Sequence, residues 1–178
     1  MEEIKFAVDT FYAVMAGALV MWMAAGFTML EAGMIKKKNA AEIVTKNLGL
    51  YSIACIMYLI CGFALMYPAG ALLDGVIPSL GTSLGLSTSM DNADIGMPYS
   101  MDYSQQADFF FQVVFVATAM SIVSGAVVGR MKILPFFLFA IVLTGFIYPI
   151  QGYWNWGGGF LSGTVGSVSY THLRAHET

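Results

Sequence analysis

The chain has 178 residues, of which 11% are charged and 58% hydrophobic, and its mean hydropathy is +0.72. Soluble proteins hold about 25% charged residues, and a small soluble domain has too little interior to bury so much apolar surface. The composition therefore disfavours a soluble enzyme, a disordered chain and a disulfide scaffold, while the net charge of −3 disfavours a nucleic-acid partner. It predicts an integral membrane protein.

Four apolar stretches are long enough to cross a bilayer, which takes about 20 helical residues. They span residues 11–30, 48–67, 109–129 and 133–152, and none contains Lys, Arg, Asp or Glu. Each is predicted to be a helix, because an isolated strand would leave its backbone groups unsatisfied in lipid. The fold class is thus predicted as all-α, with four transmembrane helices. The absence of charge within them disfavours an enzyme or a proton pump complete within this chain.

The connections between these helices predict their orientation. Basic residues gather in the first and third connections: Lys36, Lys37, Lys38, Lys46, Arg130 and Lys132. The second connection, residues 68–108, has no Lys or Arg and holds five aspartates: Asp74, Asp91, Asp94, Asp102 and Asp108. Because basic loops face the cytoplasm, we predict that the N-terminus and the second connection lie outside. That connection is predicted to be irregular, with at most one short helix.

Two further sets of residues were considered as sites. Glu31 ends the first helix five residues before Lys36 and is interpreted as an interfacial charge, with a functional role as the alternative. His172 and His176 have a spacing that can bind a metal on a helix, but they lie outside the apolar stretches and outside any HExxH pattern. We therefore predict no metal site and no cofactor.

Small residues at helical spacing predict close packing between helices. They lie in the first and third apolar stretches or just after them: Gly17, Gly26, Gly33, Ser121, Gly125 and Gly129.

Three aromatic residues are the strongest candidates for a binding site. Phe111 and Phe115 are four residues apart near the external end of the third helix, so they share one helix face. Trp156 follows the external end of the fourth helix. Aromatic faces attract a cation by roughly 0.5–2 kcal/mol, and they do so without a fixed carboxylate that would hold it too tightly. From composition alone, the alternative that these side chains serve only in packing or in an interfacial belt remains open.

Several motifs, in this order, resemble the ammonium transporter family, the Amt/Mep/Rh proteins. They are Gly-Phe-Thr-Met-Leu-Glu-Ala-Gly-Met-Ile-Lys-Lys-Lys-Asn (26–39), Asp-Phe-Phe-Phe-Gln-Val-Val-Phe-Val-Ala-Thr (108–118), Ser-Gly-Ala-Val-Val-Gly-Arg-Met (124–131), Gly-Phe-Ile-Tyr-Pro (145–149) and Trp-Asn-Trp-Gly-Gly-Gly (154–159). The resemblance extends from about Asp9 to Gly163. The tryptophan at 156 favours the Amt/Mep branch.

The resemblance implies a multi-pass transporter of the cell membrane, built as a homotrimer of eleven-helix subunits with inverted halves and an external N-terminus. It implies that Phe111 and Trp156 recruit ammonium or its analogue methylammonium through cation–π contacts, and that Phe115 belongs to a gate above an apolar pore. A cytoplasmic regulatory protein is a further implied partner. An ammonium sensor on the same scaffold and a structural membrane subunit without transport are the alternative functions.

Parts of the family pattern are missing from this sequence. The paired pore histidines, a serine of the recruitment site and an Asp-Phe-Ala-Gly motif would come from later helices. His172 and His176 do not match the pore histidines in position or context. We therefore expect an N-terminal fragment that is inactive alone. Residues 164–178 leave the family pattern and are predicted to be a non-native tail, with an authentic variant C-terminus as the alternative.

Overall fold

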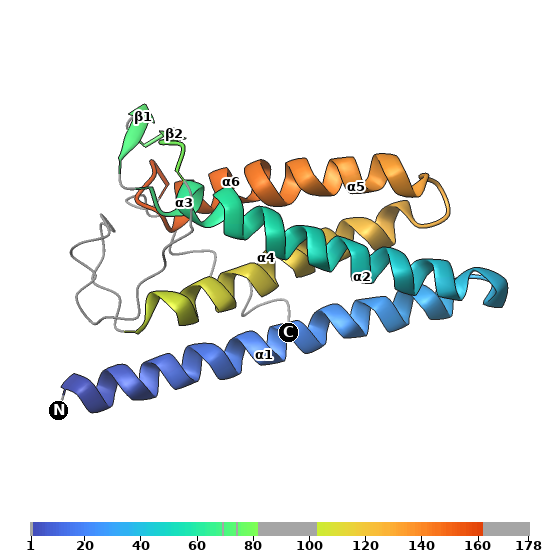
Figure 1. Cartoon of the computed structure of the whole chain (residues 1–178), viewed down its shortest axis with the longest axis horizontal. Coiled ribbons are helices and arrows are strands. Elements are labelled where there is room, and N and C mark those ends of the chain that lie inside the picture. The colour runs from blue at the N-terminus through green and yellow to red at the C-terminus, as the bar shows by residue number, and fades with distance from the viewer. Residues whose placement is uncertain (1, 69, 74, 82–102, 162–178) are drawn as a thin grey trace.

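The structure is a computed structural model and describes residues 2–68, 70–73, 75–81 and 103–161. The described residues form four long helical segments, which run side by side in alternating directions (Figure 1). In chain order the elements are α1 (Glu2–Met34), the 3-10 turn η1 (Lys37–Asn39), α2 (Ala40–Met57), the π-helical turn η2 (Tyr58–Gly62), α3 (Phe63–Met66), β1 (Ala71–Leu73), β2 (Ile77–Pro78), α4 (Gln105–Val127), α5 (Ile133–Val142), the π-helical turn η4 (Leu143–Ile147) and α6 (Tyr148–Asn155).

The four predicted transmembrane helices are confirmed, as α1, α2–η2–α3, α4 and α5–η4–α6. Each is long and apolar enough to cross a membrane. The first two begin earlier than predicted, at Glu2 and Ala40 instead of residues 11 and 48. Hydropathy locates only the stretch that lies in hydrocarbon, whereas helical hydrogen bonds continue into the polar interface.

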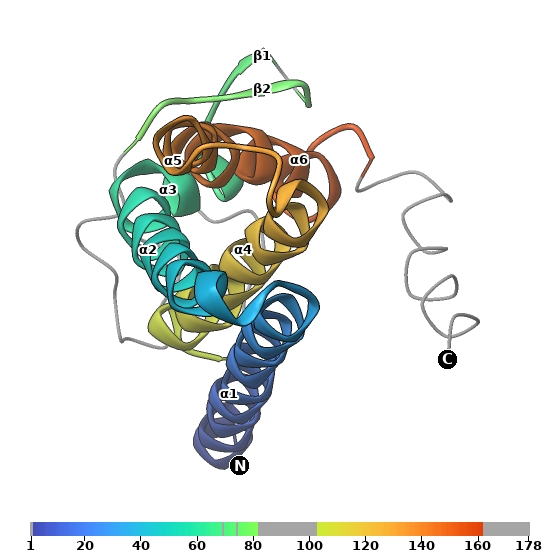
Figure 2. The same ribbon diagram turned by 90° about the vertical axis from the view of Figure 1, so that its right-hand side faces the viewer.

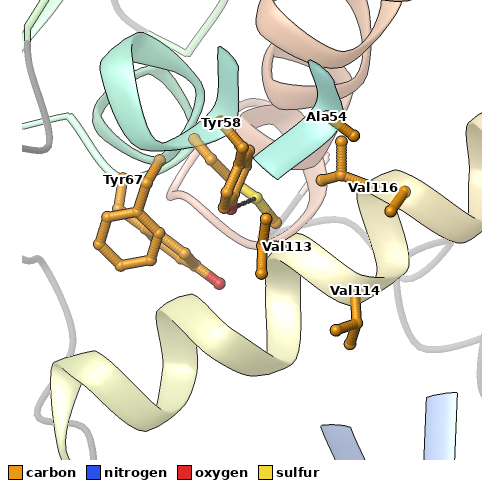
Figure 3. Packing of buried hydrophobic residues seen from close by; sticks show 9 residues of the cluster. Ala54, Tyr58, Tyr67, Val113, Val114 and Val116 are labelled. Atoms are coloured by element: carbon orange, nitrogen blue, oxygen red, sulfur yellow. Dashed lines mark hydrogen bonds between the residues drawn. The ribbon is translucent and has the colours of Figure 1, made fainter. Parts of the chain in front are cut away.

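The helices pack around α4, which contacts both α1 and α2, while α2 also contacts α5 and α3 contacts α6 (Figure 2). A core cluster of buried side chains lies between α2, α3 and α4: Ala54, Tyr58, Phe63, Met66, Tyr67, Val113, Val114, Val116 and Ala117 (Figure 3). The Tyr58 hydroxyl donates to Met66 Sδ at 3.0 Å, so the one polar atom of this large side chain is satisfied inside the cluster.

The connection after α3 differs from the prediction. Its described part forms a small antiparallel hairpin of β1 and β2, with Gly75 at φ 75° between the strands, and no helix is found in residues 68, 70–73 or 75–81. Residues 82–102, which carry most of the predicted acidic charge, lie outside the described residues.

The two basic connections lie at one end of the bundle, opposite the N-terminus, the hairpin and the end of α6 (Figure 1). We name the end with the basic connections the inner end and the opposite end the outer end. This arrangement is the one that the charge pattern requires, and the direction of insertion remains a prediction.

The prediction of close packing at glycines holds only in part. A Cβ added at Gly17 would lie 2.8 Å from the Phe110 ring, so this glycine does allow α1 to approach α4. At Gly26 and Gly33 an added Cβ would meet no atom within 4 Å in the described part of the chain, so the prediction is wrong there. Gly129 has φ +71° just after α4 and serves to end that helix.

Candidate functional site

Two hydrogen bonds of Ser104 fix the outer end of α4, just before the helix turns that carry Phe111 and Phe115. Ser104 caps the helix, since its Oγ accepts a hydrogen bond from the Ala107 N–H at 3.2 Å. The Ser104 N–H donates to Thr10 Oγ1 on α1 at 3.1 Å, which ties the start of α4 to the neighbouring helix. The side chains of the next two turns are therefore held in a defined orientation.

Phe111 and Phe115 share one face of α4, as their spacing predicts. Their ring centroids lie 4.9 Å apart with an interplanar angle of 65°, an edge-to-face contact, and both side chains are half-buried. Trp156 follows α6 and packs against the core cluster that includes Val113 and Val116 of α4. Its convergence with Phe111 and Phe115 on one cation remains a prediction.

Each of the three glycines after Trp156 occupies a position where a side chain would be unfavourable, and the reason differs from one glycine to the next. A Cβ at Gly157 would overlap the Met66 carbonyl oxygen, and one at Gly159 would lie 2.5 Å from Trp154 Cα. Gly158 has φ 86°, a conformation that residues with a side chain rarely adopt. The turn is therefore pressed against the end of α3, and the Trp154 indole holds it to the hairpin by donating to the Val76 carbonyl at 2.7 Å.

Asp108 corrects a prediction. The sequence places it in the acidic external connection, but it lies in the first turn of α4 and is fully buried. The Tyr103 hydroxyl donates to its Oδ1 at 3.3 Å, while Oδ2 has no hydrogen-bond partner among the described residues. The Gln112 amide, one turn further on, donates to the Tyr67 hydroxyl at 3.1 Å.

The Tyr103 phenol is a neutral donor to Asp108 at physiological pH. Burial raises the pKa of Tyr103, and the negative charge of Asp108 raises it further. A phenol is neutral or negative and never positive, so Tyr103 satisfies Asp108 Oδ1 without balancing the charge of the carboxylate.

Glu31 corrects a second interpretation. Only 2% of its surface is exposed, so it is buried between helices instead of being an exposed charge at the helix end. Its Oε2 forms an ion pair with Lys46 Nζ at 3.2 Å and accepts hydrogen bonds from Asn47 Nδ2 at 3.1 Å and Ser124 Oγ at 3.0 Å. We name these four side chains the inner polar cluster.

Lys46 joins this cluster to all four helical segments. The sequence places it in a loop, whereas it lies inside α2 because that helix begins at Ala40. Besides its ion pair with α1, its Nζ donates to the Ser124 carbonyl of α4 at 3.5 Å and lies 5.0 Å from the centroid of the Phe136 ring of α5. It also lines a cavity of about 360 Å³ at the inner end, together with Glu42, Arg130 and Lys132.

The described residues hold no group of three or more His, Cys, Asp or Glu side chains that could bind a metal ion. His172 and His176 lie outside the described residues.

Comparisons with known proteins all point to the same family. The model of a family described as "Ammonium Transporter Family" matches residues 11–169. The chain is 39% identical over 161 residues to "Ammonium transporter Amt2" of Archaeoglobus fulgidus, which covers 90% of this chain and 31% of that protein. It is 38% identical over 148 residues to "Ammonium transporter Amt2" of Haloferax mediterranei, which covers 82% of this chain and 30% of that protein.

A solved structure agrees with these relatives. The chain matches a "Sensor Amt Protein" with a TM-score of 0.74 and 30% identity, over 88% of this chain and 36% of that one. The chain thus spans about a third of the length of the curated relatives it matches. The relatives are named as transporters and a sensor, not as enzymes.

Proposed function

Because this chain belongs to the Ammonium Transporter Family, we propose that the protein carrying it moves ammonium or ammonia across the cell membrane. The chain forms an all-α, multi-pass membrane segment, and its share of the relatives' length supports a role as one part of a longer transporter. The rest of the pore, with its histidines, would come from helices beyond the described residues. A homotrimer and a cytoplasmic regulatory partner belong to the same proposal.

The observation that carries the proposal is the aromatic pair on α4. Phe111 and Phe115 stand one turn apart with ring centroids 4.9 Å from each other, near the outer end of a membrane-length helix. A π-face compensates part of the hydration that a small cation loses, by roughly 0.5–2 kcal/mol. In the proposal, Phe111 and Trp156 recruit the cation and Phe115 lies at the gate to the apolar pore.

A second candidate function is ammonium sensing on the same scaffold. It is favoured by one observation, the match to a solved structure named a sensor Amt protein. A sensor needs binding at the aromatic site but no turnover, so transport assays separate it from a transporter.

The experiment compares two substitutions in the full-length protein by uptake of labelled methylammonium, normalised to the amount of protein in the membrane. Trp156→Leu keeps an apolar side chain but removes the π-face, so we expect a rise in half-saturation of about 2–30-fold and a smaller change in maximal flux. Phe115→Ala should change maximal flux or selectivity more than half-saturation. If both variants keep wild-type affinity, flux and selectivity, the assignment of recruitment and gate is wrong.

A further inference from the structure

We propose that the buried carboxyl group of Asp108 raises the affinity of the outer aromatic site for a monovalent cation, by placing a negative charge beside the cation when it binds. This inference deepens the proposed function and rests on it. It makes the site a combination of π-faces and one carboxylate.

The first argument is the state of the carboxylate itself. Asp108 is 0% exposed, and its Oδ2 has no hydrogen-bond partner among the described residues. Within the same ranges no lysine or arginine forms an ion pair with it. The polar side chains that stabilise it, Tyr103 and Gln112, are both neutral and so do not balance its charge. A buried carboxylate without a compensating cation is unfavourable, so a site that presents one is suited to accept a cation.

The second argument is position along α4. Asp108 and Phe111 are three residues apart in one helix, so their Cβ atoms are neighbours about 5–6 Å apart. The Phe111 ring in turn contacts Phe115. If a cation over the Phe111 face is taken to lie roughly 7 Å from the carboxylate, it is attracted to the charge without being held by direct coordination. The charge therefore acts on capture at the first ring.

A simpler explanation is that Asp108 only stabilises the start of α4, since acidic side chains favour the positive end of a helix dipole. That role does not require burial, and the Ser104 hydroxyl already caps the helix through the Ala107 N–H. A purely structural Asp108 would affect the amount of folded protein, whereas a counter-charge would affect the half-saturation concentration of the protein that does fold.

The test is uptake of labelled methylammonium by the full-length protein and its Asp108→Asn variant, normalised to protein in the membrane. Asparagine keeps the size and an acceptor for Tyr103 but removes the charge. Coulomb attraction between unit charges roughly 7 Å apart, at an effective dielectric constant of about 20, corresponds to a fiftyfold effect on binding. We expect half-saturation to rise by about ten- to fiftyfold and maximal flux to change by less than about threefold.

Two control variants separate the charge from other effects. Asp9→Asn removes a half-buried carboxylate of α1 at the same end and should change half-saturation by less than about twofold at physiological salt, because solvent screens it. Tyr103→Phe removes the hydrogen bond but keeps the charge, and should stay within about threefold of wild type. A change in the tyrosine variant as large as in Asp108→Asn would overturn the inference.

The remaining outcomes are also decisive. Wild-type half-saturation in Asp108→Asn, with wild-type uptake intact, overturns the role of Asp108 and leaves the proposed function standing. No uptake by the wild-type protein overturns the proposed function itself. If Asp108→Asn does not reach the membrane, Asp108→Glu and Asp108→Gln are compared, and equal half-saturation in that pair overturns the inference.

Discussion

The inner polar cluster offers the sharpest stability prediction. Lys46→Met removes an ion pair and a cation–π contact but leaves the Glu31 carboxylate buried among α1, α2 and α4. Removing one partner of a buried pair typically destabilises a protein by about 3–5 kcal/mol. Asn47 and Ser124 still donate to Glu31, and the adjoining cavity can admit water, so we expect the lower value, about 3 kcal/mol.

The double variant tests whether the loss comes from the unpaired charge. Glu31→Gln with Lys46→Met removes both charges, while an amide oxygen can still accept from Asn47 and Ser124. We expect this protein to be destabilised by only about 1–2 kcal/mol, less than Lys46→Met alone, because no buried charge is left without a partner.

The assay is chemical unfolding of the full-length protein in detergent micelles, followed by tryptophan fluorescence. Lys38→Met is the matched control, since this lysine is exposed at the same inner end and should change the free energy of unfolding by less than about 0.5 kcal/mol. The reasoning is refuted if Lys46→Met behaves like the control, or if the double variant is less stable than Lys46→Met.

Two further predictions concern topology and the glycine turn. In a version of the chain without its native cysteines, a cysteine at position Ser87 should react with a membrane-impermeant thiol reagent from outside and one at Lys37 should not; the reverse pattern would contradict an external N-terminus. Gly157→Ala should lower the free energy of unfolding by about 1–3 kcal/mol, because the added Cβ would overlap the backbone of α3. Gly26→Ala should leave the free energy of unfolding unchanged or raise it, because a Cβ added there meets no atom of the described residues within 4 Å. Equal effects of the two substitutions would refute the steric explanation.

The sequence predicts the features that depend on local periodicity. Hydropathy locates all four membrane helices, and the four-residue spacing of Phe111 and Phe115 predicts their shared face, which the ring contact confirms. The glycines after Trp156 are recognisable as a motif, but their reasons are contacts with the distant end of α3, which spacing alone does not reveal.

The buried polar groups were missed because each lies at the edge of an apolar stretch. Lys46 and Asp108 fall just before the stretches that begin at residues 48 and 109, so hydropathy places both in connections. Their partners come from other helices, and Glu31 contacts Ser124 across 93 positions of sequence. A prediction that began the second helix at Ala40 instead of residue 48 places Lys46 within that helix. Its partner is then recognisable as Glu31, the acidic residue near the end of the first helix.

The central claim is that this chain is part of an ammonium transporter whose pore needs helices beyond it. The most direct measurement is uptake of labelled methylammonium into vesicles that contain either the full-length protein or the 178-residue chain alone. We expect saturable uptake, displaced by ammonium, with the full-length protein, and uptake no greater than in empty vesicles with the chain alone. Uptake by the full-length protein no greater than in empty vesicles would contradict transport, and saturable uptake by the chain alone would contradict the need for further helices.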